Sequence, residues 1–444
     1  MKQQYNFTEG DIRRQLIFFS LPIMLTNLLQ VSYQFIDSLW VGNLIGANAL
    51  GSVAVASTVI FVALSFIIGI NNATLTILSQ QKGKQDEEAL ARYLNAFVVV
   101  LAGLALIAGL GGFFFAEKIL QLLNTPGALL HEAKVYLQIN SLGIAFLIGY
   151  NFIGTVMRAL GDSKTPLKIV LAAVVLNTFL DPIFIAFFNL GVNGAAVATI
   201  ISQGLAFLFG IHYVLRRKMA PFSKPSLPAK EEVTLIMKLG IPAGLQMSVI
   251  SAGIAAIMSV VNSFGASVVS GFSAAQRLDS VIMIPAQALG TAVNSMAGQN
   301  IGVNKWDRVS RISKFGLVLN ITIMLIIALF VVIFAERAIR LFIQEPESVR
   351  FGKQYLRTIA FFYPFLGINF ILNGTVRASG AMYQVLVLNL ISFWVLRYPL
   401  TSILSTFLGD KGIAFGMGFS FVISSMVAFL YYRYGKWRKN QLFS

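Results

Sequence analysis

The chain has 444 residues, of which 57% are hydrophobic and only 12% are charged, about half the charged share of an average soluble domain. It has no cysteine and only two histidines, so disulfides, thiolate chemistry and a histidine-rich metal site are excluded. The net charge of +16 fits basic loops that face anionic lipid better than it fits a nucleic-acid-binding protein.

Twelve segments are long and apolar enough to cross a bilayer, which takes about 20 residues. Continuous apolar runs favour helices over the alternating strands of a membrane β-barrel, so we predict an all-α polytopic membrane protein. The spans are expected at residues 13–41, 49–79, 93–116, 134–157, 167–188, 193–215, 234–263, 268–297, 314–335, 354–376, 383–407 and 412–432.

The positions of Lys and Arg orient these spans. The two termini and every second connection between spans together hold about three times as many basic residues as the remaining connections. This bias predicts that both termini lie in the cytoplasm. The start of the chain lacks the basic stretch and short apolar run of a cleavable signal, so the first span is expected to be retained in the plasma or inner membrane.

The segment Arg216–Glu232 contains three prolines and mixed charge, and it divides the chain almost in half. The two halves align at an offset of about 219 residues: TVMRALG matches GTVRASG, and LGVNGAA matches LGDKGIA. We predict a six-helix bundle at 1–218, a cytoplasmic linker at 219–232 and a second six-helix bundle at 233–444. An even number of spans per half makes the repeats parallel, as in many secondary transporters.

Three acidic residues fall inside spans: Asp37, Asp181 and Asp279. A carboxylate at the centre of a membrane helix costs about 2.5–3.5 kcal/mol, and such residues usually face the protein interior and serve a function. Asp279 can pair with Arg277 or with Arg397, and we expect a structural ion pair there.

Asp37 lies on a polar and aromatic face of the first span. Its three- and four-residue spacings place Gln30, Tyr33 and Gln34 on the same side of the helix. The matching position in the second half is Ile257, which carries no charge. Either these groups make structural contacts between helices, or Asp37 belongs to a buried site that takes up a proton or a cation.

Asp181 lies in the fifth span, one turn after Asn177 and directly before Pro182. Proline cannot donate a backbone hydrogen bond, so the carbonyl of Thr178 is left unpaired. Burial disfavours a charged carboxyl group, and a second acid nearby disfavours it further. These acids are therefore suited to bind a proton on one side of the membrane and release it on the other. A proton that crosses a membrane potential of about 100 mV releases about 2.3 kcal/mol.

Other residues are candidates for binding or for movement. Aromatic faces attract organic cations and methionine adapts to varied shapes, so Tyr33, Phe35 and Met283 are candidate substrate contacts. Pro22 and Pro242 bend the first span of each half, either as static kinks or as moving parts. Phosphate-binding, zinc-protease and serine-hydrolase motifs are absent, so no enzyme is predicted.

Pro22 in the first span, FIDSLWVGNLIG after it, MRALGDSKTP after the fourth span and NTFLDPIFI in the fifth resemble the multidrug and toxic compound extrusion (MATE) family. Within that family the chain is most similar to the bacterial branch named for DNA-damage-inducible protein F (DinF). The resemblance covers nearly the whole chain. It implies a V-shaped pair of six-helix bundles with a central cavity, and antiport of organic cations against protons or sodium ions.

The resemblance also implies roles for particular residues. The acid that binds the coupling ion and competes with substrate corresponds to Asp37, the fifth-span motif to Asn177 and Asp181, and the sixth-span threonine to Thr199. The oxygen atoms of these four residues could instead hold Na⁺. Another branch of the family uses carboxylates in the seventh and tenth spans, and this chain has none there.

We therefore predict a proton-coupled multidrug efflux antiporter, with H⁺ as coupling ion and Na⁺ as the alternative. Its partners are small organic cations, drugs and the lipid bilayer, with no cofactor and no nucleic acid, and we expect a monomer. A second alternative is a lipid-linked oligosaccharide flippase of the same superfamily. That function needs several basic residues for a pyrophosphate, and only Arg277 and Arg397 lie deep within spans, away from the span ends.

Overall fold

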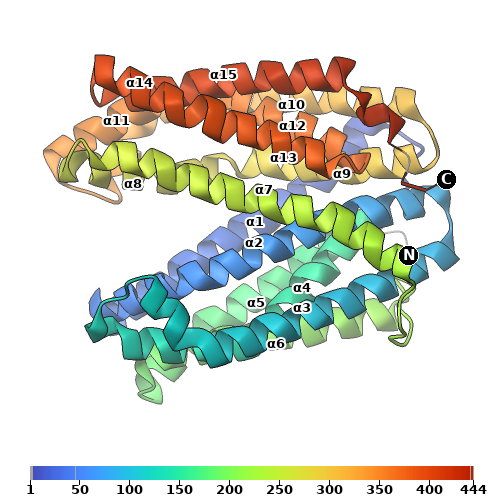
Figure 1. The fold of residues 1–444 in the computed structure, drawn as a ribbon, viewed down its shortest axis with the longest axis horizontal. Coiled ribbons are helices and arrows are strands. Elements are labelled where there is room, and N and C mark those ends of the chain that lie inside the picture. The colour runs from blue at the N-terminus through green and yellow to red at the C-terminus, as the bar shows by residue number, and fades with distance from the viewer. Residues whose placement is uncertain (1–3, 46, 441, 444) are drawn as a thin grey trace. The chain divides into compact units, whose positions relative to one another are not determined.

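The computed structural model describes residues 4–45, 47–440 and 442–443, without the side chains of residues 34 and 47–50. Helices form almost all of this part of the chain, and no strand occurs in it (Figure 1). The predicted all-α fold is confirmed. The elements are α1 (Ile12–Leu44), α2 (Ala47–Lys84), α3 (Glu87–Leu122), α4 (Gly127–Ala159), α5 (Lys164–Pro182), η1 (Ile183–Phe187), α6 (Gly191–Arg216), α7 (Lys230–Asn262), α8 (Ala266–Ile282), α9 (Ile284–Gly302), α10 (Trp306–Arg340), α11 (Pro346–Ala360), α12 (Tyr363–Ala378), α13 (Met382–Leu390), η2 (Ile391–Arg397), α14 (Tyr398–Leu408), α15 (Lys411–Tyr434) and η3 (Lys436–Lys439).

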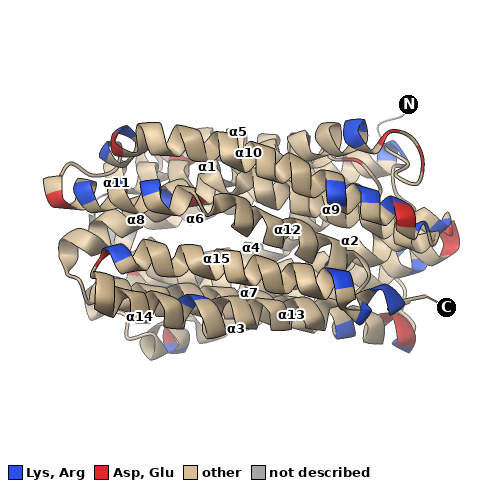
Figure 2. Ribbon diagram, turned by 90° about the horizontal axis from the view of Figure 1, so that it is seen from above, with Lys and Arg blue, Asp and Glu red and all other residues tan. Residues whose placement is uncertain are grey.

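Eleven stretches of helix in the described residues are long and apolar enough to cross a membrane. The remaining predicted span, 268–297, is divided into α8 and α9, which meet at Met283. Pro285 explains the break, because proline disfavours the helical conformation of the residue before it and lacks a backbone donor. Charged residues lie mostly towards the ends of the helices, with long stretches that hold few charged residues between them (Figure 2).

The chain forms two compact units. The first unit comprises Leu21–Ile241 and the N-terminal residues up to Asn6, and the second comprises Phe7–Ser20 and the chain from Pro242 onward. Both changes of unit within a helix fall beside a proline, Pro22 in α1 and Pro242 in α7. The stretch between α6 and α7, residues 217–229, overlaps most of the predicted linker at 219–232. In it, the backbone of Ser226 forms two hydrogen bonds with Asn95 of α3.

Matching glycines permit close helix packing in both units. Gly194 of α6 lies against the carbonyl of Phe184, and Gly412 of α15 lies against the carbonyl of Leu404. A Cβ atom at either position would overlap backbone atoms, which cannot move aside as a flexible side chain can. The aligned motifs LGVNGAA and LGDKGIA therefore share a glycine for the same physical reason.

Candidate functional site

The polar face of α1 points into the first unit. Gln30 donates from Nε2 to Asn151 Oδ1 of α4 over 3.4 Å. One turn later, Tyr33 lies close to Tyr150 of α4 and to Thr199 of α6. Asp37 follows one further turn along, and its side chain is largely enclosed. The face predicted from residue spacing thus turns towards α4 and α6, although the side chain of Gln34 lies outside the described residues.

Asp181 lies at the end of α5 and is 0% exposed. Asn177 is also buried and donates from Nδ2 to Asp181 Oδ1 over 2.9 Å. Helix α5 ends at Pro182, and the π-helical turn η1 begins at the next residue. Proline removes one bond of the helical ladder, and π-turns of this kind are frequent at functional sites.

Asp37 and Asp181 form an acidic pair without a basic partner. Their carboxyl groups lie near enough to repel each other, and neither makes an ion pair with any residue that the structure describes. Four buried oxygen atoms around them accept no hydrogen bond from the described residues: Asp37 Oδ1, Asp181 Oδ2, Asn177 Oδ1 and Thr199 Oγ1. Buried polar atoms are nearly always paired, so this cluster is suited to bind a proton or a small cation.

The chemistry of these oxygen atoms limits what they could hold. Carboxylate, amide and hydroxyl oxygens suit hard cations, whereas Zn²⁺ and similar ions favour histidine and cysteine. Within the described ranges, no group of three or more His, Cys, Asp and Glu side chains could hold a metal ion. The residues of the acidic pair therefore fit H⁺ or a hard cation such as Na⁺.

The expected ion pair of Asp279 is wrong. Tyr355 of α11 donates to Asp279 Oδ2 over 3.3 Å, and Tyr363 of α12 donates to Oδ1. Arg277 lies two residues away on α8, where residues do not share a face, and its guanidinium approaches the ring of Phe342. Two tyrosines thus replace the arginine that the sequence suggested.

Arg397 does not pair with Asp279 either. Its guanidinium carbon lies 3.8 Å from the ring centre of Phe393 and 4.6 Å from that of Phe421. Its Nε atom donates to Ser420 Oγ over 3.3 Å. The aromatic rings therefore stabilise the charge of Arg397 in place of a carboxylate.

The candidate substrate contacts fall in different units. Tyr33 and Phe35 belong to the first unit with Asp37. Met283 belongs to the second unit, where it is 7% exposed and packs in the apolar core with Phe272 and Met324. The structure therefore groups Tyr33 with the acidic pair and does not group Met283 with it.

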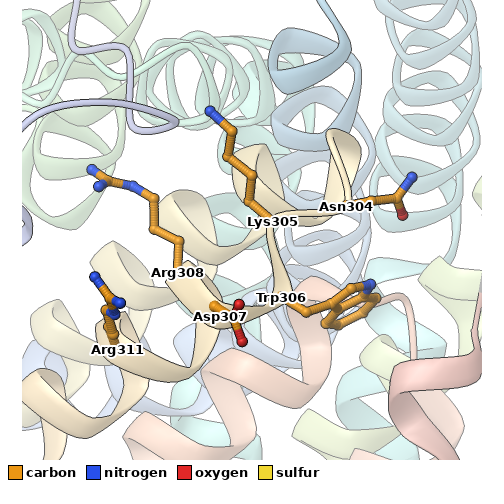
Figure 3. Close-up of a pocket in the computed structure, with 6 residues that line it drawn as sticks. All are labelled: Asn304, Lys305, Trp306, Asp307, Arg308 and Arg311. Atoms are coloured by element: carbon orange, nitrogen blue, oxygen red, sulfur yellow. The ribbon is translucent and has the colours of Figure 1, made fainter.

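A surface hollow of about 310 Å³ lies at the start of α10, with Lys305, Arg308 and Arg311 in its wall (Figure 3). Lys305 Nζ donates to the carbonyl of Thr8 over 3.0 Å, and Arg308 donates to the carbonyls of Phe7, Glu9 and Gly10. These cations hold residues 7–10, the N-terminal segment of the second unit.

Sequence reasoning missed the tyrosines around the acids. Tyr136 of α4 lies within electrostatic reach of both Asp37 and Asp181, and Tyr355 and Tyr363 bind Asp279. Tyrosine is common in membrane proteins, particularly near the interfaces, so residue type alone does not distinguish these three. Only the packing of separate helices brings them to the carboxyl groups.

Comparison with known proteins tests the predicted family. The profile of the MatE family matches residues 22–183 and 242–403, once in each half and starting at Pro22 and Pro242. The probable multidrug resistance protein YpnP of Bacillus subtilis is 61% identical over 440 residues, which cover 99% of both chains. A second probable multidrug resistance protein of that organism, YoeA, is 29% identical over 446 residues, covering 98% of this chain and 96% of YoeA.

Solved structures show the same fold. A mutant form of the Vibrio cholerae MATE transporter VcmN has a TM-score of 0.92 at 22% sequence identity, covering 97% of this chain and 98% of that chain. The family match extends over well more than half of the chain. With the acidic pair in the first unit, the paired prolines and the repeated fold, it shows that the chain belongs to the MATE family of membrane transporters.

Proposed function

We propose that this chain is a proton-coupled multidrug efflux antiporter that exports organic cations and hydrophobic drugs by alternating access. The observation that carries this proposal is the acidic pair of Asp37 and Asp181, which lies in one unit without a basic partner among the described residues. Two relatives named as probable multidrug resistance proteins support the substrate class.

The location and branch are part of the same proposal. We place the chain in the DinF branch and in the plasma or inner membrane, as a monomer with both termini in the cytoplasm. The basic residues of alternate connections support this orientation. We retain the bundles at 1–218 and 233–444 as the domains of the transporter, with 219–232 between them.

The proposed cycle uses the cost of burying charge. Ionised Asp37 attracts an organic cation, which Tyr33, Phe35, Gln30 and Gln34 help to hold, and we retain Met283 as a separate candidate substrate contact in the second unit. A proton from outside neutralises Asp37 and removes the attraction, so the cation leaves. At an effective dielectric of about 20 this attraction is a few kcal/mol, and about 2.8 kcal/mol corresponds to a hundredfold change in affinity.

The protonated form then returns inward and releases its proton to the more alkaline cytoplasm. Asp181, Asn177 and Thr199 complete the proton site, because each contributes a buried oxygen atom without a hydrogen-bond partner among the described residues. We assign the bending to Pro22 and Pro242, where helices pass from one unit to the other, and to Pro182, where α5 ends in a π-turn.

Sodium coupling is the alternative that a specific observation favours. The unpaired oxygens of Asp37, Asn177, Asp181 and Thr199 are the ligand types that hard cations take. The flippase alternative has less support, because it needs arginines that bind a pyrophosphate. Arg397 instead contacts two aromatic rings, and Arg277 approaches a third.

The test uses purified protein in proteoliposomes with a fluorescent organic cation. A pH gradient and a sodium gradient are imposed separately. We expect transport with the pH gradient alone, and about a hundredfold less in Asp37→Asn. Transport driven only by sodium would overturn proton coupling, and full activity in Asp37→Asn would remove the role of that acid. Glu88→Gln is the matched control, because its side chain is 87% exposed on α3.

A further inference from the structure

The second unit contains a buried acid that the proposed cycle does not use. Asp279 of α8 accepts hydrogen bonds from Tyr355 of α11 and Tyr363 of α12, one on each carboxyl oxygen. Both tyrosines are almost fully buried, at 2% and 1% exposure. A phenol has a single hydrogen to donate, so two donors aimed at one carboxyl group favour its ionised form.

Tyr355 has a second acceptor within reach. Its hydroxyl lies 3.3 Å from Asp279 Oδ2 and 3.6 Å from Met417 Sδ on α15. One hydrogen cannot serve both acceptors fully, and a thioether sulfur is a weak acceptor. The hydroxyl therefore has two arrangements: one that supports an ionised Asp279, and one in which it turns to Met417 and leaves Oδ2 free.

A buried cation within electrostatic reach of Tyr355 is stabilised independently of Asp279. Arg397 lies between the rings of Phe393 and Phe421, and its Nη2 atom has no hydrogen-bond partner in the described part of the chain. Arg397 is within electrostatic reach of Tyr355 but does not contact the carboxyl group. Cation–π contacts stabilise a desolvated guanidinium by up to about 2 kcal/mol, so neutralising Asp279 does not leave Arg397 unsupported.

The remaining charges near Asp279 are engaged elsewhere. Arg277, on the same helix, approaches Phe342. α10 packs against α8, and its Glu336 binds Arg340 and also Lys353 of α11. The groups that face Asp279 are therefore Tyr355, Tyr363 and, beyond Tyr355, Arg397.

A small hollow lies beside Tyr355. It has a volume of about 10 Å³ and is lined by Tyr355 together with Gln354, Asp410 and Lys411. That volume corresponds to about one water molecule. Lys411 belongs to a connection that the distribution of basic residues assigns to the outside.

We propose that Asp279 is a second proton-binding site of this transporter, located in the second unit and loaded from the outer hollow through Tyr355. The proton binds to Oδ2, the Tyr355 hydroxyl turns to Met417 Sδ, and Tyr363 continues to donate to Oδ1. No other bond forms or breaks. This inference deepens the proposed proton coupling and rests on it, because the same gradient would load both sites.

The test measures protonation directly, so that it does not depend on transport. Infrared difference spectra between about pH 8 and about pH 5 report the C=O stretch of protonated carboxyl groups. The measurement is made on full-length protein in lipid, in an Asp37→Asn/Asp181→Asn background that removes the first site. We expect one buried carboxyl band to remain, and we expect Asp279→Asn in that background to abolish it.

Tyr355→Phe serves as a second variant, because it removes one hydroxyl and keeps the ring that packs against Phe272 and Phe351. It should leave the frequency of the Asp279 band nearly unchanged, since the Tyr355 hydroxyl already points to Met417 when Asp279 is protonated, and it should make the band appear at a higher pH, since the ionised carboxyl group loses a donor. Glu347→Gln, whose side chain is 69% exposed, is the control and should leave the band in place. If no buried carboxyl band titrates in this range, or if it persists in Asp279→Asn, Asp279 is only a structural anchor and the inference is overturned.

The two proposals fail separately. Sodium-driven transport by the wild type would overturn the proposed function, whereas the infrared band would still report whether Asp279 binds a proton. Proton-driven transport without an Asp279 band would leave the proposed function intact and remove the second site.

Discussion

The two units repeat one fold but differ in charge at matching positions. In the first unit Asp37 and Asp181 bring two acids together without a basic partner in the described residues. In the alignment of the two halves, Asp37 matches Ile257 of the second unit, which is 2% exposed and packs in the apolar core. Asp181 aligns with Tyr398 in the second half. The residue before Tyr398 is Arg397, a buried cation that contacts two aromatic rings.

This difference separates what the fold requires from what the chemistry requires. The proline of the first span and the glycine of LGVNGAA recur in both halves, because they meet backbone demands that are the same in each unit. The acidic pair occurs once. The backbone architecture is therefore repeated in both halves, whereas the pairing of two buried acids is not.

The largest expected difference in export activity is between Asp181→Asn and a variant of Tyr398, the matching residue of the second unit. Asp181→Asn should lower proton-driven export about a hundredfold, because it removes one carboxyl group and the repulsion, of a few kcal/mol, that favours protonation of the pair. Tyr398→Phe, at the matching position of the second unit, should leave export nearly unchanged. The measurement is export from proteoliposomes under a pH gradient. Equal losses in both variants would contradict the assignment of coupling to the first unit.

The shared glycines test the similarity of the units. Gly194→Ala and Gly412→Ala should each reduce the free energy of unfolding by about 1–3 kcal/mol, the usual cost of overpacking. Thermal unfolding in detergent measures this change. Gly103→Ala is the control, because nothing lies within 4 Å of a Cβ atom there. A stable Gly412→Ala beside an unstable Gly194→Ala would mean that the two motifs do not serve the same packing.

A variant of Asn177 tests whether the hydrogen bond to Asp181 affects proton binding. Asn177→Leu removes the amide that donates to Asp181 Oδ1, and a hydrogen bond to a charged group contributes about 1.5–3 kcal/mol. We expect the pH at which export is half-maximal to move to a higher value, because the ionised carboxylate loses a donor. Thr178→Val is the matched control, since that hydroxyl bonds only to Val174 of its own helix. An unchanged pH profile in Asn177→Leu would argue against a role in proton binding.

The smallest expected effect concerns the start of α11 in the second unit. Hydrogen bonds from Ser348 and Ser267 lower the pKa of the Glu345 carboxyl below its ordinary value. A lowered pKa in the folded state contributes stability above the unfolded-state pKa of about 4.3, and this contribution is lost as the pH falls through the folded-state value. Wild type should therefore lose slightly more thermal stability on acidification than Glu345→Gln. Glu347→Gln, with an exposed side chain, should behave like the wild type.

Much of the fold followed from the sequence. Long apolar runs predict helices because a bilayer leaves no other partner for backbone groups, and eleven of these spans are long apolar helices in the described residues. The predicted span 268–297 is divided because it contains Pro285. Hydropathy alone predicted one continuous helix there and did not detect the break at this proline. The polar face of α1 was also predictable, since the 3.6-residue period fixes which side chains share a side.

The amino-acid sequence by itself determined the helices, the repeat, the family and the three acids within the membrane, because each depends on local composition or on motif order. Tertiary structure decided which groups meet those acids. It placed Asp181 near Asp37 without a cation, and it gave Asp279 two tyrosines where an arginine was expected. The reason is physical: the partners of a buried charge come from other helices, and their rotation and depth are set by packing rather than by distance along the chain.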